Sequence, residues 1–355
     1  MTPPPGLITV EELAAGAAHT TLLDEHGTIR DPLVVVDLDR QSASEAVRRR
    51  ALEQAASCDR LLVGLTRTTH PPADLLEVLD LTLAPAGETE SDLRTVTVDA
   101  PEAAAQSVQR AATDHPAAAV VLGGLLRAAA RSTVDQALDA ESLSYSTLLA
   151  GADFAHWLHT HGPRPAPPPA TADTVLITRD DKVLNLTLNR PERRNAYGRE
   201  LRDALVSALD IALLDPTITQ VILDGNGPSF CSGGDLGEFG IATDLAAAHM
   251  IRTRGGAARP LHRLRDRVTV HVHGSCVGAG IELPAFASRI VAAPGTQFRL
   301  PELSMGLIPG AGGTVSIPRR IGRWRTLYLV LTGCALPADR ALSWGLVDDL
   351  QMTGS

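Results

Sequence analysis

The chain has 355 residues, 44% of them hydrophobic, which is enough for one large domain or for two smaller domains with ordinary cores. Its net charge of -9 and the lack of a basic stripe interleaved with aromatic residues exclude the electrostatic signature of a nucleic-acid-binding protein. The four cysteines show no metal-binding or disulfide spacing, and there is no signal-peptide pattern or membrane-length apolar run. These features predict a cytoplasmic protein that acts on small molecules, with no metal site, no nucleic-acid partner and no membrane partner.

The first half alternates predicted strands and helices and then becomes wholly helical. Apolar runs predict strands at 32–39, 59–65 and 79–85, and the periodicity of 44–56 predicts a helix between the first two. After Val98 the pattern is helical through PEAAAQSVQRAATDH, VVLGGLLRAAARS and LDAESLSYSTLLAGADFAHWLHTH. This order is typical of an α/β domain that ends in helices.

A proline-rich segment, GPRPAPPPATAD at 162–173, follows these helices. Its prolines favour extended polyproline geometry and cannot continue a helix or a central strand. We therefore predict an interdomain linker between residues 1–161 and residues 174–355. Beyond the linker, alternation over 174–189 predicts a hairpin, 200–215 a helix, and QVILDG at 220–225 a short buried strand, again an α/β order.

Two glycine-containing segments of the second half predict binding of a negatively charged oxygen. FCSGGDLGEFG, at 230–240, has a Gly-Gly pair that lets backbone N–H groups approach a ligand closely. GSCVGAGIELPAF, at 274–286, follows an apolar strand and places a further free N–H, near Ala279, at the start of a helix, where an anion is favoured. Two such donors directed at one oxygen form an oxyanion hole.

Two glutamates lie in similar apolar, glycine-rich surroundings. Glu282 belongs to the segment just described, and Glu302 lies in LPELSMGLIPGAGG at 300–313, whose PGAGG begins another helix. A buried carboxylate is costly unless it is paired, hydrogen-bonded or protonated. Either residue alone would be interpreted as a helix-terminal or salt-bridged acid, but together in these motifs they indicate acid/base chemistry.

Residues 174–350 resemble the crotonase (enoyl-CoA hydratase/isomerase) superfamily. The resemblance covers about half of the chain and rests on motifs in family order: LNRPERRNA at 188–196, FCSGGD, a GxGxE-like helix start, PELSMGLIPGAGG, and LTGCALPADRALSWGLVDDL at 331–350. It implies an α/β spiral of ββα units and a coenzyme A thioester whose carbonyl oxygen binds the N–H groups of Gly234 and Ala279. It also implies that Glu282 activates water at Cβ while Glu302 exchanges the proton at Cα.

The resemblance further implies contacts with coenzyme A, which would enter only as part of the substrate, so no separate cofactor is expected. The residues that match the family's adenine- and pantetheine-binding positions, or that would meet phosphates, are Ser232, Asp235, Leu236, Gly237, Gly310, Arg193 and Arg194. Leu236 and Gly237 stand where the family often has a lysine, which weakens that contact. Family habit predicts a homo-oligomer, a trimer or a dimer of trimers.

The first half contains a diverged copy of part of the second. Residues 61–85 align without gaps with 270–294, and apolar positions correspond. Ala73 stands in the place of Glu282. Pro71 and Pro72, which have no N–H to donate, stand in the places of Gly280 and Ile281. We therefore predict a degenerate, catalytically inactive crotonase-like domain. Its helical tail resembles the C-terminal helices of ordinary crotonases, which the second half lacks, and we expect this tail to complete the coenzyme A site.

The leading functional prediction is a hydro-lyase, an enoyl-CoA hydratase or dehydratase. The alternatives within the superfamily are other reactions through the same enolate: isomerisation, decarboxylation, or cofactor-free oxygenation of an aryl-acetyl-CoA. A non-catalytic coenzyme A-binding subunit is favoured only if the shortened C-terminus leaves the site open. Retention of both Glu282 and Glu302 favours water chemistry.

Overall fold

The computed structural model describes residues 6–39, 44–68, 71–87, 92–162 and 164–351 and divides the chain into two compact units. The first unit comprises Met1–Ala130 and Ile321–Thr332, and the second comprises Arg131–Arg320 and Gly333–Ser355. Helices α6 (Val134–Leu149) and α7 (Ala152–His161), predicted to end the first domain, therefore group with the second unit. The proline-rich segment joins α7 to β6 (Val175–Asp180) inside that unit. The sequence had predicted instead that this segment links two domains.

The first unit is built on a parallel five-stranded sheet whose order follows the chain. Its strands are β1 (Leu7–Thr9), β2 (Leu33–Asp37), β3 (Leu61–Leu65), β4 (Leu81–Pro85) and β5 (Thr95–Val98). Helices α1 (Val10–Ala14), α2 (Glu45–Ala56) and α3 (Ala73–Val78) share one core with β2 and β3, and α4 (Pro101–Asp114) and α5 (Pro116–Ala129) also pack on the sheet. Strands β2 and β3 are buried throughout, as expected for parallel strands covered by helices.

The second unit contains a six-stranded sheet, in the order β14-β11-β9-β8-β7-β6, and a three-stranded sheet, β10-β12-β13. The bounds are β7 (Val183–Leu188), β8 (Gln220–Gly225), β9 (Val268–Val272), β10 (Ser275–Val277), β11 (Arg289–Ala292), β12 (Gln297–Arg299), β13 (Leu336–Pro337) and β14 (Asp349–Leu350). The predicted hairpin is confirmed as the antiparallel pair β6 and β7, and the other neighbours in the larger sheet are parallel. The strand predicted at 220–225 is confirmed as β8.

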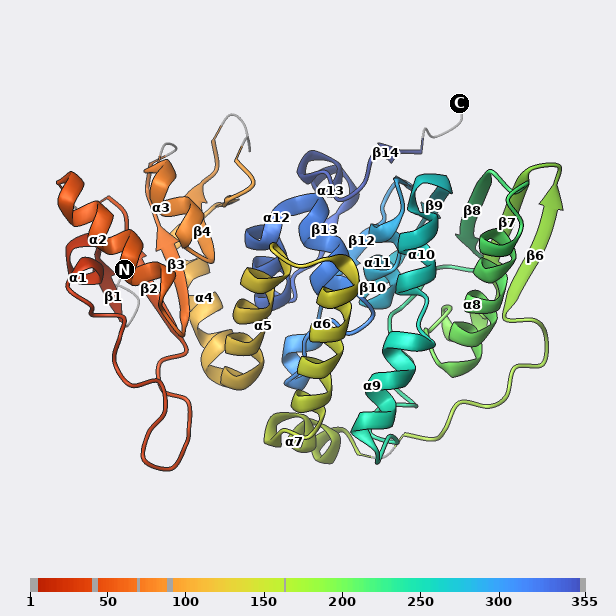
Figure 1. The fold of residues 1–355 in the computed structure, drawn as a ribbon, viewed down its shortest axis with the longest axis horizontal. Coiled ribbons are helices and arrows are strands. Elements are labelled where there is room, and N and C mark those ends of the chain that lie inside the picture. Colours follow the sequence, from red (N-terminus) through yellow and green to blue (C-terminus); the bar gives the residue numbers. More distant parts are fainter. Residues whose placement is uncertain (1–5, 40–43, 69–70, 88–91, 163, 352–355) are drawn as a thin grey trace. The chain divides into compact units, whose positions relative to one another are not determined.

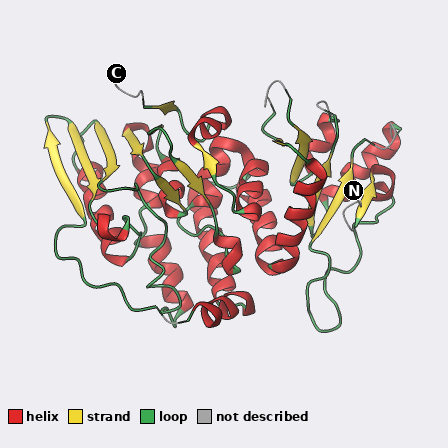
Figure 2. Cartoon of the chain, turned by 180° about the vertical axis from the view of Figure 1, so that it is seen from behind, coloured by secondary structure: helices red, strands yellow, loops and turns green. Residues whose placement is uncertain are grey.

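Helices cover these sheets, as Figure 2 shows in red and yellow. They are α8 (Arg199–Leu214), α9 (Leu245–Arg254), α10 (Ala258–Leu264), α11 (Ala279–Glu282), α12 (Gly313–Thr332) and α13 (Ala338–Trp344), with 3-10 turns η1 (Pro191–Arg193), η2 (Arg265–Arg267), η3 (Pro284–Phe286) and η4 (Glu302–Met305). Helix α8 packs on β6 and β7, and α6 lies beside α9 (Figure 1). Helix α12 bends at Gly322, where φ is 79°, so its second half belongs to the first unit. No helix within the described residues is long and apolar enough to cross a membrane.

Candidate active site

A cavity of about 570 Å³ in the second unit collects residues from all three motifs. Gly234 comes from the loop after β8, Ala279 and Glu282 come from α11, and Glu302 begins η4. Side chains of α6, α7 and α9 supply much of the remaining wall. The volume lies within the range of small-molecule sites in proteins.

Two backbone N–H groups in the cavity wall, those of Gly234 and Ala279, have no hydrogen-bond acceptor in the described part of the chain. The loops that carry them are joined, because Val277 N–H donates to the Cys231 carbonyl at 3.1 Å and Cys231 forms a β-bridge with Cys276. The Ala279 N–H is the first of α11, where no intrahelical acceptor exists. Two unpaired donors therefore lie on adjacent loops of one cavity.

Glu282 and Glu302 are both buried, with exposed fractions of 2% and 8%, and they approach each other beside Gly278. Gly278 has a φ of +49°, and a Cβ built on it would lie 2.7 Å from Glu302 Oε1 and 3.6 Å from Glu282 Oε1. A side chain at this position would occupy the space that the carboxylates use. The residue between them must therefore be glycine.

The environments of the two carboxyl groups differ. Glu282 Oε2 accepts hydrogen bonds of 2.8 Å from the N–H groups of Ala311 and Gly313, which oppose the effect of burial, and its pKa is raised to about 7. Glu302 Oε2 has no hydrogen-bond partner within the described residues, and burial together with the charge of Glu282 holds its pKa well above the ordinary value. Burial thus raises the pKa of both carboxyl groups, and the two backbone N–H donors partly oppose this effect at Glu282.

A third buried carboxylate, Glu141 on α6, had not been singled out from sequence. It is 2% exposed and accepts hydrogen bonds from the Gly312 N–H at 2.7 Å, the Thr314 N–H at 2.9 Å and the Thr314 hydroxyl at 2.7 Å. Burial and the neighbouring charge of Glu282 raise its pKa to about 8. The available signal was the spacing of Glu141, Tyr145 and Leu149, which share one helical face and all line the cavity.

The predicted coenzyme A contacts fall into two groups. Ser232, Asp235, Leu236 and Gly310 line the cavity, whereas Gly237, Arg193 and Arg194 do not. The Arg193 guanidinium forms hydrogen bonds of 2.9 and 2.6 Å with the buried Asp235 carboxylate, so these two side chains hold each other. Gly237 faces the proline-rich segment, since a Cβ on it would lie 2.9 Å from the Pro165 carbonyl. Two arginines that sequence had not indicated, Arg199 and Arg202, line the cavity.

Helices that precede the proline-rich segment form one side of the cavity. Arg252 of α9 donates to the Ser142 hydroxyl at 3.1 Å and to the Ser146 hydroxyl, both on α6. The same guanidinium lies 4.9 Å from the centre of the Tyr145 ring. Trp157 of α7 contacts Phe239, with ring centres 6.3 Å apart. The site is therefore covered by α6 and α7.

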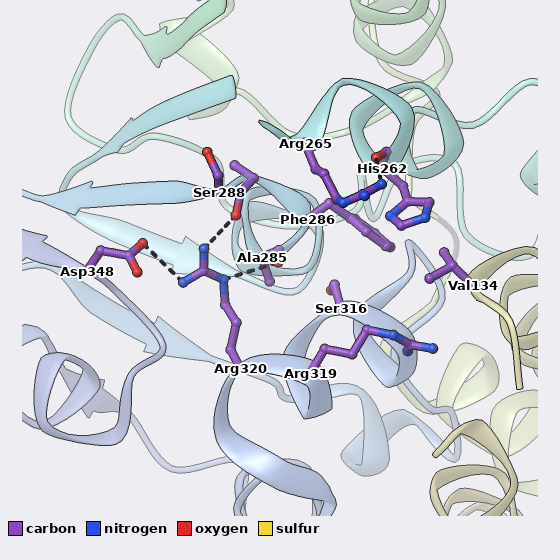
Figure 3. Close-up of a pocket in the computed structure, with 11 residues that line it drawn as sticks. Val134, His262, Arg265, Ala285, Phe286, Ser288, Ser316, Arg319, Arg320 and Asp348 are labelled. Atoms are coloured by element: carbon purple, nitrogen blue, oxygen red, sulfur yellow. Dashed lines mark hydrogen bonds and ion pairs between the residues drawn. The ribbon is translucent and has the colours of Figure 1, made fainter. Parts of the chain in front are cut away.

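A second cavity of about 410 Å³ in the same unit carries different chemistry (Figure 3). Arg320 in its wall donates to the carbonyls of Ala285 and Ala287 and to Asp348 at 3.1 Å, and thereby fastens the C-terminal segment to the chain around η3. Asp348 is the one carboxylate among the lining residues, and it forms an ion pair with Arg320. The acid/base pair lies in the larger cavity, which we take as the candidate active site.

Comparisons with known proteins place the second half of the chain in a known family. Residues 178–352 match the family model described as enoyl-CoA hydratase/isomerase. The 2,3-dehydroadipyl-CoA hydratase of Escherichia coli K12 is 36% identical over 176 residues, which cover 50% of this chain and 68% of that protein. The 1,2-epoxyphenylacetyl-CoA isomerase of the same organism is 36% identical over 178 residues, with 49% and 68% covered.

Solved structures show the same likeness. The enoyl-CoA hydratase of Mycobacterium smegmatis is 29% identical, covers 50% of this chain and 70% of its own, and has a TM-score of 0.47. On the match of the family model and the two Escherichia coli relatives, the chain belongs to the enoyl-CoA hydratase/isomerase family. The second unit accordingly has the α/β crotonase fold that the sequence predicted.

Proposed function

We propose that this protein is an enoyl-CoA hydratase, which adds water to the Cα=Cβ bond of a 2-enoyl-CoA thioester or removes it in the reverse direction. The observation that carries the proposal is the convergence of Glu282 and Glu302 beside Gly278, in the cavity that also presents two unpaired N–H groups. A hydration needs a base for water, an acid for Cα and stabilisation of an enolate, and this cavity offers a candidate for each.

In the proposed mechanism the thioester oxygen accepts hydrogen bonds from the N–H groups of Gly234 and Ala279. Negative charge grows on this oxygen as water attacks Cβ. Preorganised donors in a site closed to bulk water stabilise such charge by about 3–4 kcal/mol for each donor. Both groups are backbone N–H donors on joined loops, so they need no reorganisation at the moment of reaction.

The two carboxyl groups divide the proton transfers. Ionised Glu282 takes a proton from the attacking water, whose oxygen bonds to Cβ, and protonated Glu302 gives its proton to Cα as the enolate collapses. The product is a 3-hydroxyacyl-CoA, and transfer of one proton from Glu282 to Glu302 through water resets the site. These roles agree with the pKa of Glu282, raised to about 7, and with the pKa of Glu302, which burial holds well above its ordinary value.

Double-bond isomerisation is a second candidate, favoured by the description of the matching family as enoyl-CoA hydratase/isomerase. Glu302 alone can remove and return a proton along an acyl chain, with the same N–H groups holding the enolate. The non-catalytic alternative required an open site, whereas α6 and α7 contribute Tyr145 and Trp157 to the cavity wall. We therefore give catalysis precedence over a binding-only role.

The test is a spectrophotometric assay with crotonyl-CoA and a panel of longer and aromatic 2-enoyl-CoA esters, in which hydration removes the absorbance of the conjugated thioester. We expect turnover by the unaltered protein and loss of about 100-fold or more in both Glu282→Gln and Glu302→Gln. Water labelled with oxygen-18 should place its label in the product.

Other outcomes point elsewhere. A gain of conjugated absorbance from 3-enoyl-CoA esters without oxygen-18 incorporation would favour the isomerase. No turnover on either panel, with acyl-CoA binding intact by calorimetry, would contradict both the hydratase and the isomerase on these acyl groups.

A further inference from the structure

Two carboxylates share the backbone N–H groups that open α12. Along residues 311–314 the groups alternate: the first and third donate to Glu282, and the second and fourth donate to Glu141. These groups lie at the start of the helix, where no intrahelical acceptor is available. One turn of chain therefore holds both acids, which come from segments far apart in the sequence.

We propose that Glu141 is a positioning residue for Glu282, which acts through this turn and makes α6 part of the active site. Helix α6 lies outside the segment 178–352 that matches the family model. The kinetic consequence of this inference rests on the proposed function, whereas the structural coupling between Glu141 and the turn does not.

The turn has few other means of support. Its residues from 310 to 313 are Gly-Ala-Gly-Gly, and Gly312 has a φ of +106°. Glycine has the largest backbone freedom of any residue, so such a stretch must be fixed by its contacts. Thr314 carries the one polar side chain of the turn, and its hydroxyl also donates to Glu141. Without Glu141, two N–H groups and this hydroxyl lose their acceptor.

The contacts of Glu141 differ from those of an acid that handles substrate protons. Both of its oxygens accept hydrogen bonds from the turn. Glu282 uses Oε2 for the turn and directs Oε1 toward Gly278, where Glu302 also lies. Proton transfer therefore falls to Glu282 and Glu302, and the effect of Glu141 reaches the substrate through Glu282.

The charge of Glu282 also acts on Glu141. The titratable and charged groups around Glu141 are Glu282 and Glu302, the Tyr145 hydroxyl on its own helix, and Arg252 on α9. Carboxyl groups packed this closely cannot all ionise, so a negative Glu282 opposes ionisation of Glu141 and raises its pKa. The two acids are therefore coupled through charge as well as through the turn that both bind.

The first experiment compares Glu141→Gln with Asp139→Asn, which removes a carboxylate from a half-exposed position of the same helix. On an enoyl-CoA that the protein turns over, we expect Glu141→Gln to lower kcat by about 10–100-fold with KM changed by less than about threefold. Asp139→Asn should change neither quantity. An unchanged kcat in correctly folded Glu141→Gln would overturn the proposal.

A second pair of variants approaches the same contact from the turn, in case Glu141→Gln folds poorly. Thr314→Val removes the hydroxyl that donates to Glu141 while keeping the shape of the side chain, and Thr314→Ser keeps the hydroxyl. We expect a smaller fall of kcat in Thr314→Val and nearly normal kcat in Thr314→Ser. Equal behaviour of the two would count against a role for the Glu141 contact.

Amide hydrogen exchange of the segment 309–316 separates this inference from the proposed function. Exchange there should become faster in Glu141→Gln than in Asp139→Asn, whether or not any enoyl-CoA is turned over. Faster exchange without turnover would refute the hydratase and leave the coupling standing. Unchanged exchange together with turnover by the unaltered protein would refute the coupling and leave the hydratase standing.

Discussion

Replacement of Gly278 by alanine should nearly abolish turnover at a modest cost in stability. The backbone at Gly278 has φ of 49° and ψ of -120°, a conformation that costs other residues about 1–3 kcal/mol. The new Cβ would lie 2.7 Å from Glu302 Oε1, and ordinary contact begins at 3.4 Å, so the carboxylate must retreat by roughly 0.7 Å. Because misplacement of a catalytic group by about 1 Å can cost 100-fold, we expect kcat to fall by about that factor.

The matched control is Gly295→Ala, at an exposed turn of the same unit. Gly295 has a similar positive φ, +77°, but a Cβ there would meet nothing within 4 Å. Urea unfolding should show comparable losses of stability in the two variants, while enoyl-CoA turnover should fall only in Gly278→Ala. The reasoning is refuted if Gly278→Ala keeps kcat within about threefold of the unaltered protein, or if Gly295→Ala is equally inactive.

Three further predictions concern stability and chain length. Folding raises the pKa of Glu141 from 4.5 to about 8, so the folded state binds more protons than the unfolded chain between these pH values, and stability should fall as the pH rises from 4.5 to 8. The urea midpoint of Glu141→Gln should fall less steeply with pH than that of the unaltered protein. Equal slopes of urea midpoint against pH would contradict this prediction. Asp235→Asn leaves the partly exposed Arg193 without its ion pair and should lower the free energy of unfolding, measured in urea, by about 1–3 kcal/mol. Arg193→Lys should lower it by less. An unchanged free energy of unfolding in Asp235→Asn would contradict this prediction. A chain that begins at residue 174 lacks α6 and α7 and should have little turnover, whereas one that begins at 131 retains the cavity wall; full activity of the shorter chain would show that the helices are dispensable.

The elements of the second unit could be predicted because their signals are local. Alternation over 174–189 and helical period over 200–215 are confirmed as β6, β7 and α8, with boundaries within a residue or two. Short elements were beyond reach: β1, β5 and α3 have three to six residues, too few to establish a period. In the folded chain these elements are specified by neighbours in the sheet, which a local pattern does not contain.

The candidate site was predictable only where a motif carried it. Glu282 and Glu302 lie in glycine-rich motifs, which make them recognisable in the sequence. Glu141 lies in an amphipathic helix, where an acid ordinarily faces solvent, and its contacts are with residues 171 and 173 positions away. The pairing of Arg193 with Asp235 was hidden for the same reason, because 42 residues separate them and each also matched a binding position of the family.

The degenerate crotonase-like domain in the first half stays a prediction, and the sheets of the two units can be compared strand by strand. Its five parallel strands lie in chain order, as do β7, β8, β9, β11 and β14 of the second unit. The aligned segments 61–85 and 270–294 correspond to β3-α3-β4 and β9-α11-β11. Among its described residues the first unit has no counterpart of the small β10-β12-β13 sheet. In the second unit that sheet begins with the strand that leads into Ala279, one of the two N–H donors.

The glycines of the family motifs also explain why α6 and α7 belong to the site. A Cβ on Gly310 would lie 2.6 Å from the Tyr145 ring of α6, and one on Gly240 would lie 2.8 Å from Leu158 of α7. Gly306 similarly lies against Asp153 at the start of α7. Any side chain at these positions would push the helices away from the loops that hold Glu302 and Gly234. The loops and the helices are therefore complementary surfaces, and a chain that kept the motif glycines without α6 and α7 would expose the cavity to water and lose the burial that raises the pKa of Glu302.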